Sequence, residues 1–199
     1  MLLKDQLQGV RLLLASQSPR RRELMTGCSL PFELAPKYEC EECYPVSLKA
    51  HEVAEFLSRL KSEAYPHALK PDELLITADT TVLLDEQVLG KPKDRADAQR
   101  MLRLLSGRSH EVVTGVTLRS CRQIESFSSV SRVWFRPLRD EEIDYYIDLA
   151  RPFDKAGAYG IQEWIGYAAI ERIDGSFYNV MGLPIQKLYT ELTKFLITK

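Results

Sequence analysis

Hydrophobic and polar residues along this chain follow two different spacings. Short apolar runs of four or five residues predict buried strands, whereas apolar residues three and four positions apart predict helices with one buried face. Arg11–Ala15 and Leu74–Ala78 are runs of the first kind, and the second of them ends at Asp79. Apolar residues at helical spacing predict an amphipathic helix over Leu48–Tyr65.

The rest of the chain continues this mixture. A helix is expected over Arg20–Thr26, and another over Ala98–Leu105, where Gly107 supplies a C-terminal cap. The stretch His110–Arg136 is strand-like on both sides of a polar turn, which predicts an antiparallel hairpin. Three further elements are expected: an acidic helix over Asp140–Leu149, a strand over Tyr167–Ile173 and a last amphipathic helix over Ile185–Phe195. The order of the elements predicts an α/β fold with a mixed, twisted sheet flanked by helices.

Composition narrows the class of protein. The chain has 199 residues, a net charge of -1, 45% hydrophobic and 28% charged residues. These values exclude a disordered or fibrous chain, and the length suits one domain or two small lobes. The apolar runs are far shorter than the roughly 20 residues of a membrane span. The near-zero charge argues against stable coating of nucleic acid, and Met1–Gln6 lacks the apolar stretch of a signal peptide, so a cytoplasmic protein is expected.

The cysteines do not form a recognisable metal or redox site. Cys40 and Cys43 make a lone C-x-x-C, and zinc would need two more ligands at similar spacing. Three glutamates surround this pair and disfavour a thiolate. We therefore expect incidental cysteines in a reducing compartment; the four are Cys28, Cys40, Cys43 and Cys121.

Basic residues gather where the helix over Arg20–Thr26 begins. Ser18 can cap this helix and Pro19 suits its first position, which leaves free N–H groups and the positive end of the dipole. Three arginines follow, although cations usually favour the other end of a helix. A bound phosphate would offset this repulsion, because arginine grips phosphate through paired hydrogen bonds. The alternative is a solvated basic face.

Charged residues also follow the run Leu74–Ala78. Asp79 stands at the end of this predicted strand, and in open α/β sheets ligands bind at such strand ends. Its carboxylate could hold a divalent ion or act as a general base. Lys91 stands between Gly90 and Pro92, on a loop suited to holding an ammonium at one point. The alternative is a turn aspartate and a surface lysine.

A third stretch, Asp154–Gln162, is rich in small residues around Lys155, so a ligand could approach the backbone closely. Gln162 carries both a donor and an acceptor, as the reading of a base edge requires. The sequence has neither the P-loop nor the dinucleotide-binding glycine pattern. Together the carboxylates, lysines, arginines and amide favour metal-assisted attack of water on a polyphosphate. A protein that only binds nucleotide would need the same cations without a base.

The chain resembles the Maf family of nucleoside triphosphate pyrophosphatases over nearly its whole length. The segments that carry the resemblance are Leu14–Arg21, Ala78–Thr80, Gly90–Pro92, Met101–His110, Thr114–Val116, Asp154–Gln162 and Asn179–Pro184. The resemblance implies cytoplasmic hydrolysis of a nucleoside triphosphate to the monophosphate and pyrophosphate, with a divalent cation (Mg or Mn). The form of Asp154–Gln162 resembles the branch that acts on dTTP and UTP, rather than 7-methyl-GTP. The implied fold has two lobes around a deep cleft, as in inosine triphosphatases, in one Maf-like domain over residues 1–199. Family members are often dimers, which leaves a homodimer open.

The resemblance also implies roles for individual residues. Asp79 matches the catalytic proton acceptor, and Glu42, together with Asp79, falls on the metal side of the site. The phosphates would meet Ser16, Arg20, Arg21, Lys61, Lys91 and Lys155. Base selection would involve Arg20, Thr80 and Gln162. Two positions depart from the family pattern: Glu41-Glu42 replaces an Asp-Glu pair, and Ser62 follows Lys61. Two other functions stay open: a non-catalytic nucleotide-binding regulator of cell division, and a hydrolase of modified pyrimidine triphosphates.

Overall fold

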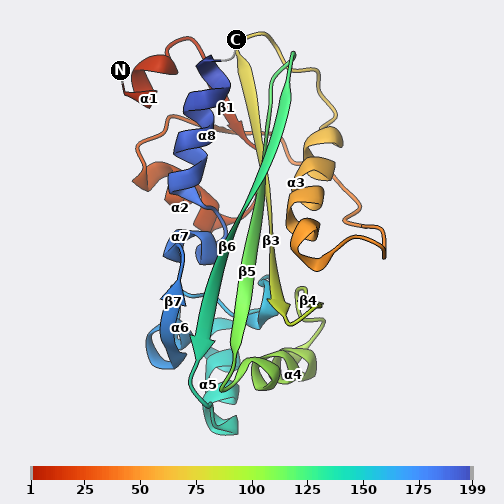
Figure 1. Ribbon diagram of the computed structural model, residues 1–199, viewed down its shortest axis with the longest axis vertical. Coiled ribbons are helices and arrows are strands. Elements are labelled where there is room, and N and C mark those ends of the chain that lie inside the picture. Colours follow the sequence, from red (N-terminus) through yellow and green to blue (C-terminus); the bar gives the residue numbers. More distant parts are fainter. Residues whose placement is uncertain (1, 198–199) are drawn as a thin grey trace. The chain divides into compact units, whose positions relative to one another are not determined.

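The computed structural model describes residues 2–197 and consists of helices and strands that are interspersed along the chain (Figure 1). The helices are α1 (Leu3–Gln6), α2 (Pro19–Gly27), α3 (Val53–Glu63), α4 (Arg95–Leu105), α5 (Asp140–Ala150), α6 (Trp164–Ala169), α7 (Phe177–Met181) and α8 (Ile185–Ile197). The strands are β1 (Arg11–Leu14), β2 (Glu33–Leu34), β3 (Glu73–Leu84), β4 (Gln87–Leu89), β5 (Ser109–Arg119), β6 (Ile124–Phe135) and β7 (Ile170–Asp174). Two 3-10 turns are η1 (Ala50–Glu52) and η2 (Ala156–Ala158).

The strands form one mixed sheet in the order β2-β1-β3-β5-β6-β7, with β4 paired to β3. β1 runs parallel to both β2 and β3, and its residues Leu13 and Leu14 stand opposite Leu75 and Ile76 of β3. β4 is antiparallel to β3, and β7 is antiparallel to β6. The predicted α/β class with a mixed sheet and flanking helices is therefore confirmed.

The chain forms two compact units. Unit 1 comprises residues 1–79, 114–129 and 182–199, and unit 2 comprises residues 80–113 and 130–181. Strands β3, β5 and β6 contribute residues to both units, and in β3 the change falls between Asp79 and Thr80.

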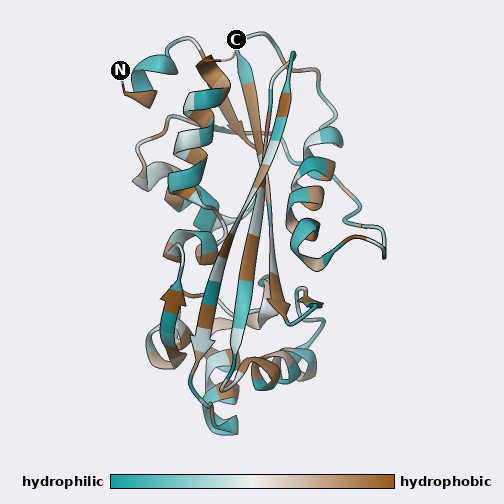
Figure 2. Cartoon of the chain, in the orientation of Figure 1, coloured by the Kyte–Doolittle hydropathy of each residue, from teal (hydrophilic) through white to brown (hydrophobic). Residues whose placement is uncertain are grey.

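Helices α3 and α8 cover the strands of unit 1, on opposite sides of them (Figure 1). Each helix buries an apolar stripe, with Val53 and Leu57 on α3 and Leu188 and Leu192 on α8. Figure 2 shows hydrophilic and hydrophobic residues together on both helices, as expected of helices with one face against a sheet. The helical spacing in the sequence predicted both helices, but the predicted Leu48–Tyr65 extends beyond α3 at both ends, since residues 50–52 form the 3-10 turn η1 and residues 48, 49 and 65 are not helical.

Gly115 of β5 allows α3 to approach the sheet closely. A Cβ atom at this position would lie 2.3 Å from the backbone carbonyl of Ala54 and 2.4 Å from the Cα of Glu55. No side chain fits there unless the helix backbone moves. Gly115 therefore determines how closely α3, the helix that carries Lys61, packs against β5.

We therefore expect Gly115→Ala to lower the free energy of unfolding by about 2 kcal/mol, the usual cost of overpacking. Gly27→Ala is the matched control, because a Cβ at Gly27 meets no atom within 4 Å. Urea unfolding of both variants measures the difference. Equal stabilities for the two variants would show that α3 does not need the close approach.

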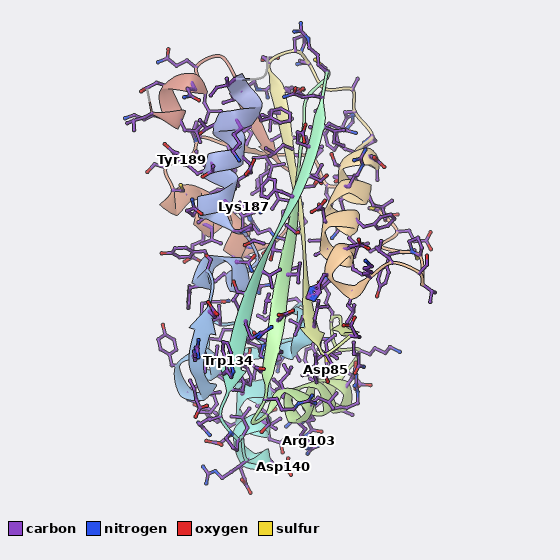
Figure 3. All side chains as sticks on the ribbon, viewed as in Figure 1. Asp85, Arg103, Trp134, Asp140, Lys187 and Tyr189 are labelled. Atoms are coloured by element: carbon purple, nitrogen blue, oxygen red, sulfur yellow. The ribbon has the colours of Figure 1, made fainter. Side chains whose placement is uncertain are left out.

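Unit 2 has its own core and its own links between helices. His110, Phe135 and Tyr159 form an edge-to-face aromatic cluster, in which His110 Nε2 and the Tyr159 hydroxyl lie 2.7 Å apart. At the surface, Arg103 of α4 donates to Asp140 of α5 at 2.8 Å; both side chains are labelled in Figure 3.

Two predicted elements differ from the structure. β3 does not end at Asp79 but continues to Leu84, because residues 80–84 are β-branched or large and apolar, and four of them are buried. Residues 167–169 belong to helix α6 and not to a strand. A short apolar run does not distinguish helix from strand by spacing alone, and here the chain turns so tightly that a Cβ on Gly166 would lie 1.7 Å from the Ile161 carbonyl oxygen.

Within residues 2–197, no helix is both long enough and apolar enough to cross a membrane.

Candidate active site

The loop after β1 leads directly into helix α2. Ser18 occupies the N-cap position and Pro19 is the first helical residue, both as predicted from the sequence. The Ser18 side chain makes no capping hydrogen bond. Instead, the Ser18 N–H donates to Ser16 Oγ at 3.3 Å, so Ser16 supplies the polar side chain that orders this turn.

Arg21 of α2 is directed into unit 1. Its Nε donates to the carbonyl of Gly182 at 2.7 Å, and its Nη1 donates to the carbonyl of Ala78 at 2.9 Å and to Ser16 Oγ at 3.3 Å. Burial lowers the pKa of Arg21, and the charge of Asp79 opposes this shift. The guanidinium therefore ties the loop after β1 to the strand residue that immediately precedes Asp79.

A lysine joins two carboxylates in unit 1. Lys61, in the last turn of α3, places Nζ 2.6 Å from Asp79 Oδ1 and 3.0 Å from Glu42 Oε1. The Lys61 and Asp79 side chains are 17% and 11% exposed, so solvent screens this pair only partly. The Tyr38 hydroxyl donates to the Lys61 carbonyl at 2.6 Å and fixes the backbone beneath the lysine.

Only one of the two adjacent glutamates takes part in this cluster. Glu42 reaches Lys61, whereas Glu41 accepts a hydrogen bond from the Cys43 thiol at 3.5 Å. The structure thus brings the predicted residues Glu42, Lys61 and Asp79 together from a loop, a helix and a strand.

The pair of carboxylates suits a divalent cation of the magnesium type. Mg²⁺ is usually held by one or two carboxylates, with water and substrate phosphate oxygens filling its other positions. Asp79 and Glu42 supply two carboxylates, and both of them contact the Lys61 ammonium. Among the described residues, no group of three or more His, Cys, Asp or Glu side chains could hold a metal. Two carboxylates are too few ligands for a fully protein-coordinated structural metal, so an ion held by Asp79 and Glu42 would share its coordination with water and a substrate.

Two loops carry the lysines predicted in unit 2. Lys91 is exposed, and the carbonyl of the preceding Gly90 accepts the Gly157 N–H at 3.0 Å. Gly157 has a φ of +66°, and a Cβ there would press on Val82 at 2.9 Å. The backbone bond joins the loop of Lys91 to the loop of Lys155. Lys155 is buried and lies 2.7 Å from Asp154 and 3.1 Å from Glu163.

The three residues predicted to select the base differ in their surroundings. Arg20 is half-buried in the first turn of α2, and Thr80 is half-buried within β3; both make interactions within the protein. Gln162 of unit 2 has a buried side-chain oxygen that finds no hydrogen-bond donor among residues 2–197. A buried carbonyl oxygen without a donor costs free energy, which makes Gln162 the member of this set best suited to accept from a ligand.

The sequence did not predict two residues that hold Lys155, either directly or through each other. Glu163 contacts Lys155, and Tyr146 contacts Glu163. No signal in the sequence pointed to them, because the three residues come from a loop, the start of α6 and a buried face of α5, with no shared spacing.

The cysteines and His110 have no part in the proposed site. All four cysteines are free, and the pKa values of the Cys40 and Cys43 thiols are raised, mainly by burial at Cys40 and by the Glu41 hydrogen bond at Cys43. A glutamate is thus the main cause of the raised thiol pKa at Cys43 only, whereas at Cys40 the main cause is burial. Burial lowers the pKa of His110 to about 3, so its ring is neutral near pH 7.

Comparison with known proteins identifies the family. The family model described as "Maf-like protein" matches residues 11–195. The chain belongs to the Maf family. Among curated Maf relatives, a protein from Porphyromonas gingivalis named dTTP/UTP pyrophosphatase is 52% identical over 193 residues, covering 96% of this chain and 97% of the relative. A protein of the same name from Bacteroides thetaiotaomicron is 53% identical over 184 residues, covering 92% and 95%.

A more distantly related solved structure resembles this chain in fold. The structure of a HAM1 protein from Coxiella burnetii matches with a TM-score of 0.50 at 16% sequence identity, covering 93% of this chain and 99% of that protein. At this identity the likeness concerns the fold alone.

Proposed function

We propose that this Maf protein is a nucleoside triphosphate pyrophosphatase that converts dTTP and UTP to the monophosphate and pyrophosphate. The observation that carries the proposal is the cluster in which Lys61 joins Asp79 and Glu42. Such a cluster combines a base, an ion-binding pair and a cation for phosphate, as hydrolysis of a phosphoanhydride requires. The names of the relatives from Porphyromonas gingivalis and Bacteroides thetaiotaomicron support the choice of nucleotide.

In the proposed reaction, the oxygen of a water molecule attacks the α-phosphorus. The bond between that phosphorus and the α–β bridging oxygen breaks, and pyrophosphate leaves with the electron pair. Asp79 orients the water and accepts its proton. Lys61 holds the Asp79 carboxylate in place at 2.6 Å. A divalent cation, Mg or Mn, would be held by Asp79 and Glu42 and would neutralise charge on the phosphates.

The remaining predicted residues bind the substrate in this proposal. The phosphates are assigned to Ser16, Arg20, Arg21, Lys61, Lys91 and Lys155, and the base to Arg20, Thr80 and Gln162. Arg21 acts mainly by positioning, because its hydrogen bonds to Ala78 and Ser16 hold the backbone beside Asp79. We place the enzyme in the cytoplasm, with the nucleotide and a second copy of the chain as its partners and without stable nucleic-acid binding.

Pyrophosphate release from a panel of triphosphates, with and without Mg²⁺ or Mn²⁺, tests the proposal. We expect metal-dependent release that is fastest from dTTP and UTP. Faster release from methylated or pseudouridine triphosphates would favour the hydrolase of modified nucleotides. Binding without release from any triphosphate would refute the enzyme and favour the regulator.

We further expect Gln162→Ala to relax base choice. The ratio of kcat/KM for dTTP over CTP should fall about tenfold, because a hydrogen bond to the base is worth roughly 1.4 kcal/mol. Gln186→Ala, on the exposed side of α8, is the matched control. Competition assays with both nucleotides measure the ratio, and an unchanged ratio would remove Gln162 from base recognition.

A further inference from the structure

A buried tyrosine and a glutamate in unit 2 form a chain of contacts that ends at Lys155. Tyr146 of α5 is fully buried, and its hydroxyl donates to Glu163 Oε2. The same hydroxyl accepts the backbone N–H of Gly160 at 3.0 Å. Both hydrogen-bonding functions of the hydroxyl are thus used, and the tyrosine is fixed in one orientation.

The other oxygen of Glu163 faces the lysine. Glu163 Oε1 lies 3.1 Å from Lys155 Nζ, while Oε2 is engaged by Tyr146. The Lys155 side chain is only 8% exposed, whereas Asp154, its second carboxylate partner, is 62% exposed. Lysine is a flexible point charge that is seldom confined by its own geometry. Glu163 is the partner that holds it from the protein side.

The glutamate itself is fixed by the turn that precedes α6. Its N–H donates to the Gly160 carbonyl at 3.0 Å, and its carbonyl accepts from Gly166 at 2.9 Å. A Cβ on Gly160 would lie 2.9 Å from the Glu163 carboxyl carbon and 3.0 Å from Gln162 Nε2. The turn is therefore packed around Gly160, and the glutamate has little room to move away from Lys155.

We propose that Glu163 and Tyr146 are positioning residues, which hold the Lys155 ammonium at the place where it meets a substrate phosphate. This inference rests on the proposed pyrophosphatase function. It predicts that Glu163 favours catalysis, although its negative charge repels the triphosphate. A carboxylate beside a triphosphate site repels the substrate, so charge alone predicts that Glu163→Gln tightens binding. Positioning predicts slower turnover, because the freed lysine no longer stabilises the transition state at a fixed point.

Steady-state kinetics with dTTP separate these two effects. For Glu163→Gln we expect kcat to fall at least tenfold while KM stays equal or decreases, and for Tyr146→Phe we expect a smaller fall in kcat. Glu171→Gln, an exposed glutamate of β7, is the matched control and should leave both constants unchanged. In the Lys155→Ala background, Glu163→Gln should change kcat less than twofold, because its effect passes through the lysine. An equal fall in both backgrounds, or no fall in either, would overturn the inference.

A second measurement does not depend on turnover. Acetic anhydride labelling of the wild-type chain, followed by mass spectrometry, compares Lys155 with the exposed Lys91. We expect Lys155 to be labelled at least tenfold more slowly than Lys91, and Glu163→Gln to remove most of this protection. Equal rates in the wild type, or protection that survives Glu163→Gln, would refute the positioning of Lys155. An inactive wild type with a protected Lys155 would instead refute the proposed function alone.

Discussion

Asp79→Asn should lower the kcat for pyrophosphate release from dTTP by about 1,000-fold, within the range that general-base catalysis contributes. Asparagine keeps the shape of the side chain but neither accepts a proton from water nor offers a charged ligand to a cation. The carboxylate it replaces is buried and lies 2.6 Å from Lys61 Nζ. Loss of this one group therefore removes both the base and half of the ion-binding pair.

The assay should include Asp85→Asn as a control. Asp85 is an exposed aspartate, labelled in Figure 3, whose carboxylate pairs with Arg108 at 2.8 Å. We expect this control to retain wild-type activity, because an exposed ion pair contributes little. Circular dichroism and thermal unfolding should show both variants folded. A folded Asp79→Asn variant with activity within tenfold of wild type would assign the proton transfer to another group.

Arg21→Met should lower the free energy of unfolding by about 3 kcal/mol, even without nucleotide, since each acceptor that loses its donor inside the protein costs about 1–3 kcal/mol. The methionine would leave the carbonyls of Ala78 and Gly182 without the donors that now lie 2.9 and 2.7 Å away. Arg21→Lys should recover only part of the loss, because an ammonium does not reproduce the planar fork of a guanidinium.

Arg22→Met is the control for this effect. Arg22 is the next residue of α2, is half-buried and donates to the Gln17 carbonyl at 3.2 Å. We expect it to change the unfolding free energy by less than about 1 kcal/mol. Urea unfolding of the three variants decides the question. If Arg21→Met were as stable as Arg22→Met while phosphate binding was lost, Arg21 would act as a substrate ligand alone, without the positioning role.

The sequence predicted those helices and strands in which the buried residues recur at a regular spacing. The helices α3, α4 and α8 have regular apolar stripes, and β1 is a short apolar run, so local pattern and packing agree. The predicted end of β3 was wrong because a charged residue interrupts the apolar run, and buried residues resume at Thr81. Asp79 is tolerated inside the strand since Lys61, from another element, neutralises its charge.

The candidate site was predictable only in part. Individual residues such as Ser18, Pro19 and Asp79 had local signals in caps and strand patterns. The contact among Glu42, Lys61 and Asp79 had none, because it joins a loop without periodicity, the end of a helix and the middle of a strand. The family resemblance supplied these residues, and the structure shows that Glu42, rather than Glu41, reaches Lys61.

Hydrolysis of dTTP in water enriched in oxygen-18 tests the central claim most directly. Mass spectrometry of the products locates the oxygen that came from the attacking water. Attack on the α-phosphorus places one labelled oxygen in dTMP and leaves the pyrophosphate unlabelled, which is the result we predict. Label in the pyrophosphate, or release of inorganic phosphate in its place, would contradict attack at the α-phosphorus and with it the reaction assigned to the Asp79–Lys61–Glu42 cluster.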